Sequence, residues 1–177
     1  MKARQFGFLV ALAVFALDQL SKWYVLGPLA LREHVNGIVP GQIYLLPIFN
    51  FTYTENQGIS LGLLNATNPV GRWMLVALTS AIAVGVAVWI GRERNRIDQV
   101  ALGMVLGGAL GNILDRVRHG FVTDFLDLHF GEFRPFLIFN VGDAAISIAV
   151  VILLLRAFVT RKDDAKGPGP EETIEHA

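Results

Sequence analysis

Two aspartates in the C-terminal half of the chain, Asp124 and Asp143, have the side chains best suited to hydrolytic chemistry. Residues 122–127 alternate apolar and polar side chains, so Asp124 falls on an otherwise apolar strand face and Asp127 on the opposite face. Two carboxyl groups in one partly desolvated site cannot easily both ionise, so they share a proton and can act as base and acid. A water molecule held between Asp124 and Asp143 could then attack an amide carbonyl. We therefore expect these two carboxyl groups to meet.

Further polar residues lie in the same part of the chain. Asn112, Asp115 and Arg116 are spaced i, i+3 and i+4, which places them on one side of a helical turn. They could form a charge-paired helix end or a polar rim that faces a substrate. Asn140 could cap a helix whose first turn contains Asp143, and the helix dipole would favour the ionised carboxylate there.

The composition indicates a membrane protein. The chain has 177 residues, of which 53% are hydrophobic and only 17% charged, outside the usual range of soluble domains. Its formal net charge of zero gives no indication of nucleic-acid binding. There is no cysteine, and the four histidines form neither an i, i+4 pair nor an HExxH motif. We expect no thiolate chemistry, no metal and no other cofactor.

Four apolar segments, at about residues 6–26, 72–90, 97–114 and 141–158, are each of about the length that crosses a bilayer. We predict an α-helical membrane protein with four transmembrane helices, in which residues 1–160 form a single domain. Asp18 and Lys22 interrupt the first segment, and no cleavage pattern follows it, so we interpret it as an uncleaved helix rather than a signal peptide. Their i, i+4 spacing suits an ion pair that ties this helix to its neighbours.

Glycines recur every four residues along the third segment. Gly103, Gly107 and Gly111, with Gly108 beside them, leave one helix face almost without side chains. Such a stripe lets neighbouring backbones approach closely. We expect this face to be a helix packing seam.

Basic residues set the expected orientation. They gather before the first span, between the second and third spans, and after the fourth, which by the positive-inside rule predicts that both termini are cytoplasmic. Residues 27–71 and 116–140 would then face outward. Arg116 and Arg118 depart from the rule, and a local partner for Arg116 is the simplest explanation.

The segments outside the spans differ in character. Residues 27–70 are expected to form a small extracytoplasmic β-rich lobe, because residues 43–54 are rich in β-branched and aromatic side chains. This lobe ends in Glu55–Gly58, which contains Asn56 and is typical of a turn. Residues 161–177 are polar and contain proline and glycine, so we expect a disordered cytoplasmic tail.

Five blocks of this sequence, taken in order, resemble the signature blocks of the lipoprotein signal peptidase family, also called signal peptidase II. The resemblance covers the chain up to about residue 158 and includes the Asn56-Gln57-Gly58 turn. The chain departs from the family pattern at Ile59-Ser60-Leu61 and at Gly142, where the family usually has alanine. The blocks are Asp18–Lys22, Asn56–Gly58, Gly107–Arg116, Val122–Asp127 and Phe139–Asp143.

The resemblance implies a bacterial plasma-membrane aspartic endopeptidase that cleaves diacylglyceryl-modified prolipoproteins immediately before the lipidated cysteine. It implies four helices and a small extracytoplasmic β-cradle, with Asp124 and Asp143 as the catalytic dyad on the extracytoplasmic side. We expect a monomer whose partners are these precursors and membrane lipid, and no nucleic acid. The family's remaining site positions correspond to substrate-binding residues Asn56, Gly108, Asn112, Arg116 and Asn140 and to supporting residues Asp18, Lys22 and Asp115.

Two other classes fit parts of the pattern. Val141-Gly142-Asp143 is similar to the motif of GxGD-type intramembrane aspartyl proteases, but Asn140 stands where their first glycine would be. A small four-helix carrier could use buried carboxylates to bind protons or cations. The sequence contains no inverted repeat that would indicate such a carrier.

Overall fold

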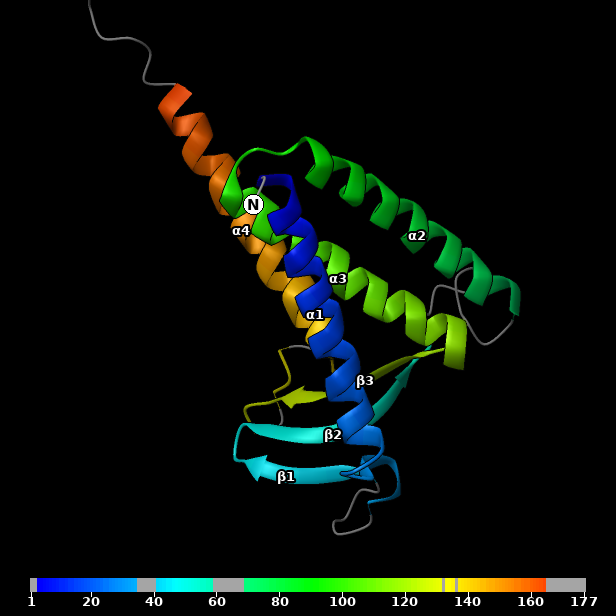
Figure 1. The fold of residues 1–177 in the computed structure, drawn as a ribbon. Helices are drawn as coiled ribbons and strands as arrows, with labels where there is room; N and C mark the ends of the chain where they lie inside the picture. Colours follow the sequence, from blue (N-terminus) through cyan, green and yellow to red (C-terminus); the bar gives the residue numbers. More distant parts are fainter. Residues whose placement is uncertain (1–2, 35–40, 59–68, 132, 136, 165–177) are drawn as a thin grey trace, which may run out of the picture.

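The structure, a computed structural model, describes residues 3–34, 41–58, 69–131, 133–135 and 137–164. It has four long helices, a short 3₁₀ helix and one antiparallel sheet, so the predicted helical membrane fold with a small β-structure is confirmed (Figure 1). All four long helices are long and apolar enough to cross a membrane. The elements in chain order are α1 (Ala3–Leu26), η1 (Leu31–Glu33), β1 (Gln42–Leu46), β2 (Phe49–Asn56), α2 (Pro69–Arg92), α3 (Arg96–His119), β3 (Val122–Leu128) and α4 (Val141–Asp164).

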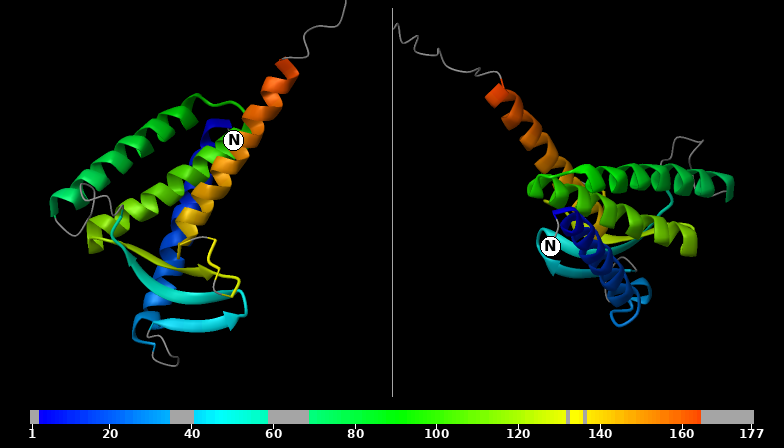
Figure 2. Two further views of the ribbon diagram at one scale, coloured as in Figure 1. Left: turned by 180° about the vertical axis from the view of Figure 1, so that it is seen from behind. Right: turned by 45° about the horizontal axis from the view of Figure 1, so that its top comes forward.

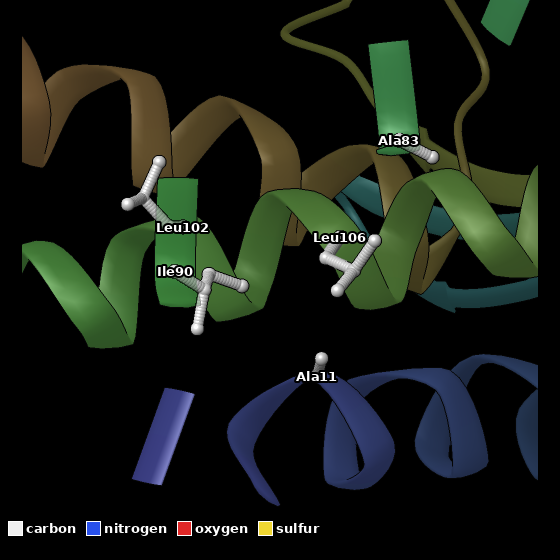
Figure 3. Close-up of a cluster of buried hydrophobic side chains, with 5 residues drawn as sticks. All are labelled: Ala11, Ala83, Ile90, Leu102 and Leu106. Carbon is white, nitrogen blue, oxygen red and sulfur yellow. The ribbon is translucent and has the colours of Figure 1, made fainter. Parts of the chain in front are cut away.

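Helix α3 is the inner helix of the bundle. Half of the residues in its apolar, membrane-spanning segment are buried, compared with about a fifth in each of the other three helices. Leu102 and Leu106 of α3 pack against Ala11 of α1 and against Ala83 and Ile90 of α2 (Figure 3). The other helices therefore present most of their surface to lipid.

The glycine stripe forms the predicted packing seam between α3 and α1. A Cβ atom added at Gly103 or Gly107 would collide with the carbonyl oxygen of Gly7 or Ala11, respectively. The absence of side chains on this face therefore lets the two backbones touch. At Gly111 the neighbouring atom is instead the carboxylate of Asp18, so the seam leads directly into the polar end of the bundle.

Helix α3 extends five residues beyond the span predicted to end at 114. Gly120 ends it in the left-handed conformation, with φ +91°, and its amide donates to the Arg116 carbonyl at 3.1 Å. Arg72 of α2 also donates to the carbonyls of Arg116 and Val117. This extra turn carries Asp115 and Arg116 toward the sheet.

Helix α4 also differs from its predicted end. It continues to Asp164, so residues 161–164 are helical, whereas the disordered tail was predicted from 161. The rest of the predicted tail, residues 165–177, and the Ile59-Ser60-Leu61 departure lie outside the described residues.

The sheet is not confined to the predicted lobe of residues 27–70. Strand β2 pairs with β1 on one side and with β3, from beyond the third helix, on the other. Thr54 pairs with Asp124 in this register. One face of the sheet packs through Phe125 onto Val25 and Leu31, so the sheet is anchored on the end of α1.

The sheet lies at the end of the bundle away from the two chain ends (Figures 1 and 2). The first turn of α1 and the last turn of α4 lie at the same opposite end of the bundle. Strand β3, which lies between α3 and α4 in the chain, is part of the sheet. The site can therefore contain residues from both helix ends and strands.

Candidate active site

Asn140 connects the two predicted catalytic carboxylates. Its side-chain Nδ2 donates to Asp124 Oδ1 at 2.6 Å, and its Oδ1 accepts from the Asp143 backbone amide at 2.9 Å. Its own backbone amide donates to Asp143 Oδ2 at 3.4 Å. Asn140 is fully buried. The two aspartates, 19 positions apart in sequence, are thus brought to the same site.

Helix α4 begins with the predicted capping arrangement. The reciprocal bonds between Asn140 and Asp143 form a capping box at the first turn. Val141 begins the helix, so the helix dipole acts on the Asp143 carboxylate. The capping role and the site position are therefore compatible, because the same atoms serve both.

Strand β3 holds Asp124 in a nearly dry environment. The residue is 1% exposed, and its Oδ2 accepts from Asn56 Nδ2 at 2.9 Å. Burial, together with the nearby Asp143 charge, raises the pKa of Asp124 from 3.8 to about 6, although the hydrogen bonds from Asn56 and Asn140 oppose this shift. Each pKa unit corresponds to about 1.4 kcal/mol, so this environment favours the neutral acid over the carboxylate by roughly 3 kcal/mol more than water does.

Asn56 ends β2 in a local turn as well as contacting the dyad. The Gly58 amide donates to Asn56 Oδ1 at 2.9 Å, and Gly58 has φ +95°. This is the turn that the sequence predicts. The turn fixes the amide oxygen, which leaves Nδ2 directed at Asp124.

A buried lysine joins three elements behind the dyad. Lys22 Nζ lies 2.8 Å from Asp18 Oδ2 and 2.9 Å from Asp115 Oδ2. It also donates to Asn112 Oδ1 at 3.3 Å, and Asn112 Nδ2 donates to Asp143 Oδ1 at 2.8 Å. The predicted Asp18–Lys22 ion pair is confirmed, and it is linked to the dyad through Asn112.

Asp18 fixes the start of α4. Its Oδ1 accepts from the Gly142 amide at 2.9 Å. A Cβ added at Gly142 would lie 3.1–3.2 Å from Asn140 Oδ1, from the Gly108 carbonyl and from Asp18 Oδ1. Glycine at position 142, where the family has alanine, therefore leaves more room between the start of α4 and these three oxygen atoms. The replacement removes no polar group from the site.

Asp115 and Arg116 do not form the local charge pair that the sequence left open. Asp115 pairs with Lys22 rather than with its neighbour Arg116, and Arg116 has no ion-pair partner within the described residues. Its charge is instead within electrostatic reach of Asp143, Asp124 and Asp115. Gly108 is buried against Gly142, where a Cβ would collide with the Gly142 carbonyl, so in this structure it serves close packing of α3 and α4.

Three contributors were not predicted from the sequence. Gln19 Nε2 donates to Asp18 Oδ2 and to Asp115 Oδ1, both at 3.1 Å. The Thr123 amide donates to Asp115 Oδ2 at 3.1 Å, which joins the residue before Asp124 to the ion-pair cluster. The third is Arg72, and its position in the first turn of α2, at the start of an apolar segment, was the available signal.

Asp127 belongs to a separate polar contact. It is 1% exposed, and its Oδ2 accepts from Thr52 Oγ1 at 2.9 Å and lies 3.4 Å from Arg134. None of its partners belongs to the dyad site. The prediction that Asp124 and Asp127 serve opposite faces is in agreement with these contacts.

An apolar cavity of about 240 Å³ adjoins Asp143. Leu128 and Phe139 form one wall, and Ala144, Ser147 and Ile148 of α4 form the other. Ser147 and Ile148 are exposed on the helix surface. The carboxylate thus borders a space that an apolar group could enter from the lipid side.

The described part of the chain has no group of three or more His, Cys, Asp or Glu side chains arranged to hold a metal ion. The acidic groups instead accept hydrogen bonds from amides or pair with Lys22. The arrangement favours acid–base chemistry by paired carboxyl groups.

Sequence comparisons agree with this geometry. The family model described as signal peptidase (SPase) II matches residues 10–159. A lipoprotein signal peptidase of Rhizorhabdus wittichii is 52% identical over 90% of this chain and 89% of its own length. Those of Sphingopyxis alaskensis and Shewanella halifaxensis are 50% and 39% identical, over 88% and 92% of this chain and 86% and 92% of their own lengths.

Two solved structures share the fold. Both are described as bacterial membrane enzyme structures obtained by the in meso method, at 2.3 and 1.9 Å resolution. The first has a TM-score of 0.72 with 24% identity and covers 96% of this chain and 94% of its own. The second has a TM-score of 0.69 with 25% identity and covers 85% and 91%.

Proposed function

Because the chain belongs to the signal peptidase II family of membrane aspartic peptidases, we propose that Asp124 and Asp143 are the catalytic dyad with which it processes lipoprotein precursors. Family membership supports an enzyme of the bacterial membrane and leaves the carrier and GxGD-type alternatives without support. The observation that carries the dyad proposal is the shared Asn140, which bonds to both carboxylates. Asn140 reaches the Asp124 carboxylate through its side chain and the Asp143 carboxylate through its backbone amide.

The reaction is a hydrolysis in which water is the nucleophile. Asp143, whose carboxylate accepts a hydrogen bond from Asn112 at the first turn of α4, takes a proton from the water as the water oxygen bonds to the scissile carbonyl carbon. Asp124, whose pKa is raised to about 6, gives its proton to the carbonyl oxygen. The tetrahedral intermediate then collapses: one of its hydroxyl protons returns to Asp124, the C–N bond breaks, and the amine leaves with the proton that Asp143 acquired, so both carboxyl groups regain their starting states.

The substrate is a diacylglyceryl-modified prolipoprotein, cut immediately before the lipidated cysteine. The cavity beside Asp143 is lined almost entirely by apolar side chains, which suits a precursor segment or acyl group that arrives through lipid. Arg116, Asn112 and Asn56 carry the polar groups that can contact the peptide backbone. Gly108 shapes the site only by letting α4 approach α3.

The site lies at the outer surface of the bilayer, and both termini are cytoplasmic. Large apolar side chains are exposed at one end of the sheet and in the loop after β3: Leu46 is 59% exposed, Phe133 66% and Leu137 91%. The His129 amide donates to the Ile48 carbonyl at 3.0 Å, so the hairpin and this loop form one tip. Such a tip suits contact with the outer leaflet. The enzyme acts as a monomer and needs no cofactor.

The test is cleavage of a lipidated precursor by purified protein, with mass spectrometry of both products. D124N and D143N should lose more than about a thousandfold in rate, because each removes one proton-transfer partner. D127N is the matched control, since it replaces another buried carboxylate on the same strand. Substantial turnover by D124N, or cleavage at another bond, would overturn the proposal.

A further inference from the structure

A second cleft lies between α1 and α3, and its lining includes Lys22 but neither Asn112, Asp124 nor Asp143. Its volume is about 430 Å³, within the range of small-molecule sites. Lys22 and Asp115 line it together with Arg118 and His119 of α3, and Trp23 and Leu26 of α1 complete the wall. None of the residues that line this cleft takes part in the proton transfers described above.

The cleft has an exposed arginine at its rim, next to a buried cluster of one lysine and two aspartates. Lys22 is neutralised by Asp18 and Asp115, whereas Arg118 is exposed and has no hydrogen-bond or ion-pair partner among the described residues. His119 adjoins it as a second nitrogen donor, and its ring lies 6.0 Å from that of Phe121. An anion would therefore find two free donors here.

The end of α3 does not itself satisfy Arg118. A helix C-terminus attracts cations through its free carbonyls. Here Arg72 donates to the carbonyls of Arg116 and Val117, and the Gly120 amide also donates to Arg116. The Arg118 guanidinium thus remains available to an external group.

The opposite wall is apolar and faces lipid. Trp23 is 64% exposed on α1, and Leu26 lies one turn further along the helix. Tryptophan is enriched where the hydrocarbon core meets the headgroups. A cationic rim beside such a wall matches a phosphate that carries acyl chains better than it matches a free phosphate ion.

We propose that this cleft binds the phosphate group of an anionic membrane phospholipid, and that the bound lipid stabilises the polar network behind Asp143. Arg118 and His119 contact the phosphate, and Trp23 and Leu26 contact the glycerol and upper acyl chains. The effect of the lipid on the polar network behind Asp143 rests on the proposed function.

Two chains of hydrogen bonds connect the cleft to the dyad. Lys22 reaches Asp143 through Asn112, with contacts of 3.3 and 2.8 Å. Asp115 accepts from the amide of Thr123, the residue before Asp124, at 3.1 Å. Lipid that holds the ends of α1 and α3 together therefore limits movement of both carboxylates.

Binding is tested with Trp23 as the probe. Of the three tryptophans, Trp73 and Trp89 are both exposed and are replaced by Phe, so that only Trp23 fluoresces. The protein is placed in phosphatidylcholine bilayers that contain about one-tenth brominated phosphatidylglycerol or, in parallel, one-tenth brominated phosphatidylcholine. We expect at least threefold stronger quenching by the anionic lipid.

The variant that tests the contact is Arg118→Gln, and Arg134→Gln is its control, because Arg134 is also an exposed arginine at the sheet end of the molecule. R118Q should quench equally with both lipids, R118K should keep most of the preference, and R134Q should keep all of it. Equal quenching in the parent protein, or an unchanged preference in R118Q, would overturn the site. Full competition by millimolar glycerol phosphate or inorganic phosphate would assign it to a soluble phosphate and overturn the lipid proposal.

Coupling to catalysis is measured separately on the lipidated precursor. Phosphatidylglycerol should raise kcat severalfold in the parent protein and R134Q but not in R118Q. Intact lipid preference without any change in kcat would refute the coupling alone. Absence of a lipid preference in the parent protein, with cleavage that still depends on Asp124 and Asp143, would refute the lipid site and leave the dyad proposal standing.

Discussion

Replacing Asn56 with alanine should shift the pH dependence of cleavage upward. Asn56 Nδ2 donates to Asp124 Oδ2 at 2.9 Å and lowers the pKa of that carboxyl against the larger effect of burial. Because Asp124 must carry a proton, kcat/KM of the parent protein should fall as pH rises through about 6. Without Asn56 the neutral acid is favoured more strongly, so the fall begins at higher pH.

The expected size follows from the lost hydrogen bond. A hydrogen bond to a charged group contributes about 1.5–3 kcal/mol, or roughly one to two pKa units. Asn56 is partly exposed, so water replaces part of that bond, and we expect an upward shift of about 0.5–1 unit. The substrate desolvates the site further, which should place the fall in kcat at higher pH than the fall in kcat/KM for both proteins.

The assay is a kcat/KM profile from pH 4.5 to about 9 with a lipidated precursor peptide in bilayers. N56A is compared with Q57A, which changes the exposed neighbouring residue. The position of the alkaline limb is the readout, because Asn56 is also proposed to contact substrate and its loss can lower the whole profile. An N56A limb that is unmoved or shifted to lower pH would refute the reasoning.

Three further predictions test the packing, the cavity and the chemistry. G103A should be destabilised by about 2 kcal/mol or more in detergent melting because its Cβ meets the Gly7 carbonyl, whereas G85A, with nothing within 4 Å, should melt like the parent; equal melting would contradict the seam. S147L should fill the cavity beside Asp143 and lower kcat/KM at least tenfold for the lipidated precursor, while the equally lipid-facing V151L should not; unchanged S147L kinetics would exclude the cavity as a substrate site. Dialysis against a chelator should leave turnover within twofold of the untreated enzyme, and recovery of lost activity by added metal would contradict the carboxyl mechanism.

Much of the site could be predicted from the sequence because its polar residues stand out against apolar segments. Asp18 and Lys22 interrupt a span at helical spacing, and their ion pair is present at 2.8 Å. Asn140 and Asp143 fit a capping box, and that box is present. These are short-range patterns, for which spacing along the chain nearly fixes the geometry.

Contacts between distant segments could not be predicted in the same way. Asp115 directly precedes Arg116 in the sequence, yet it pairs with Lys22. The reason is that close packing along the glycine seam brings α1 against α3. Strand β3 completes a sheet that begins about eighty residues earlier with β1, and this pairing depends on how α2 and α3 return the chain. Spacing alone carries no information on which partner a buried charge meets after such packing.

The central claim is that Asp124 and Asp143 act as one unit, and single-turnover cleavage of a lipidated precursor by D124N, D143N and the double variant tests it most directly. If one shared proton drives the reaction, the double variant should be no slower than either single variant, within about threefold. D127N should cleave at nearly the parental rate, with all four proteins monodisperse in detergent. Rate losses that multiply in the double variant, or a single variant that retains substantial turnover, would contradict the shared-proton dyad.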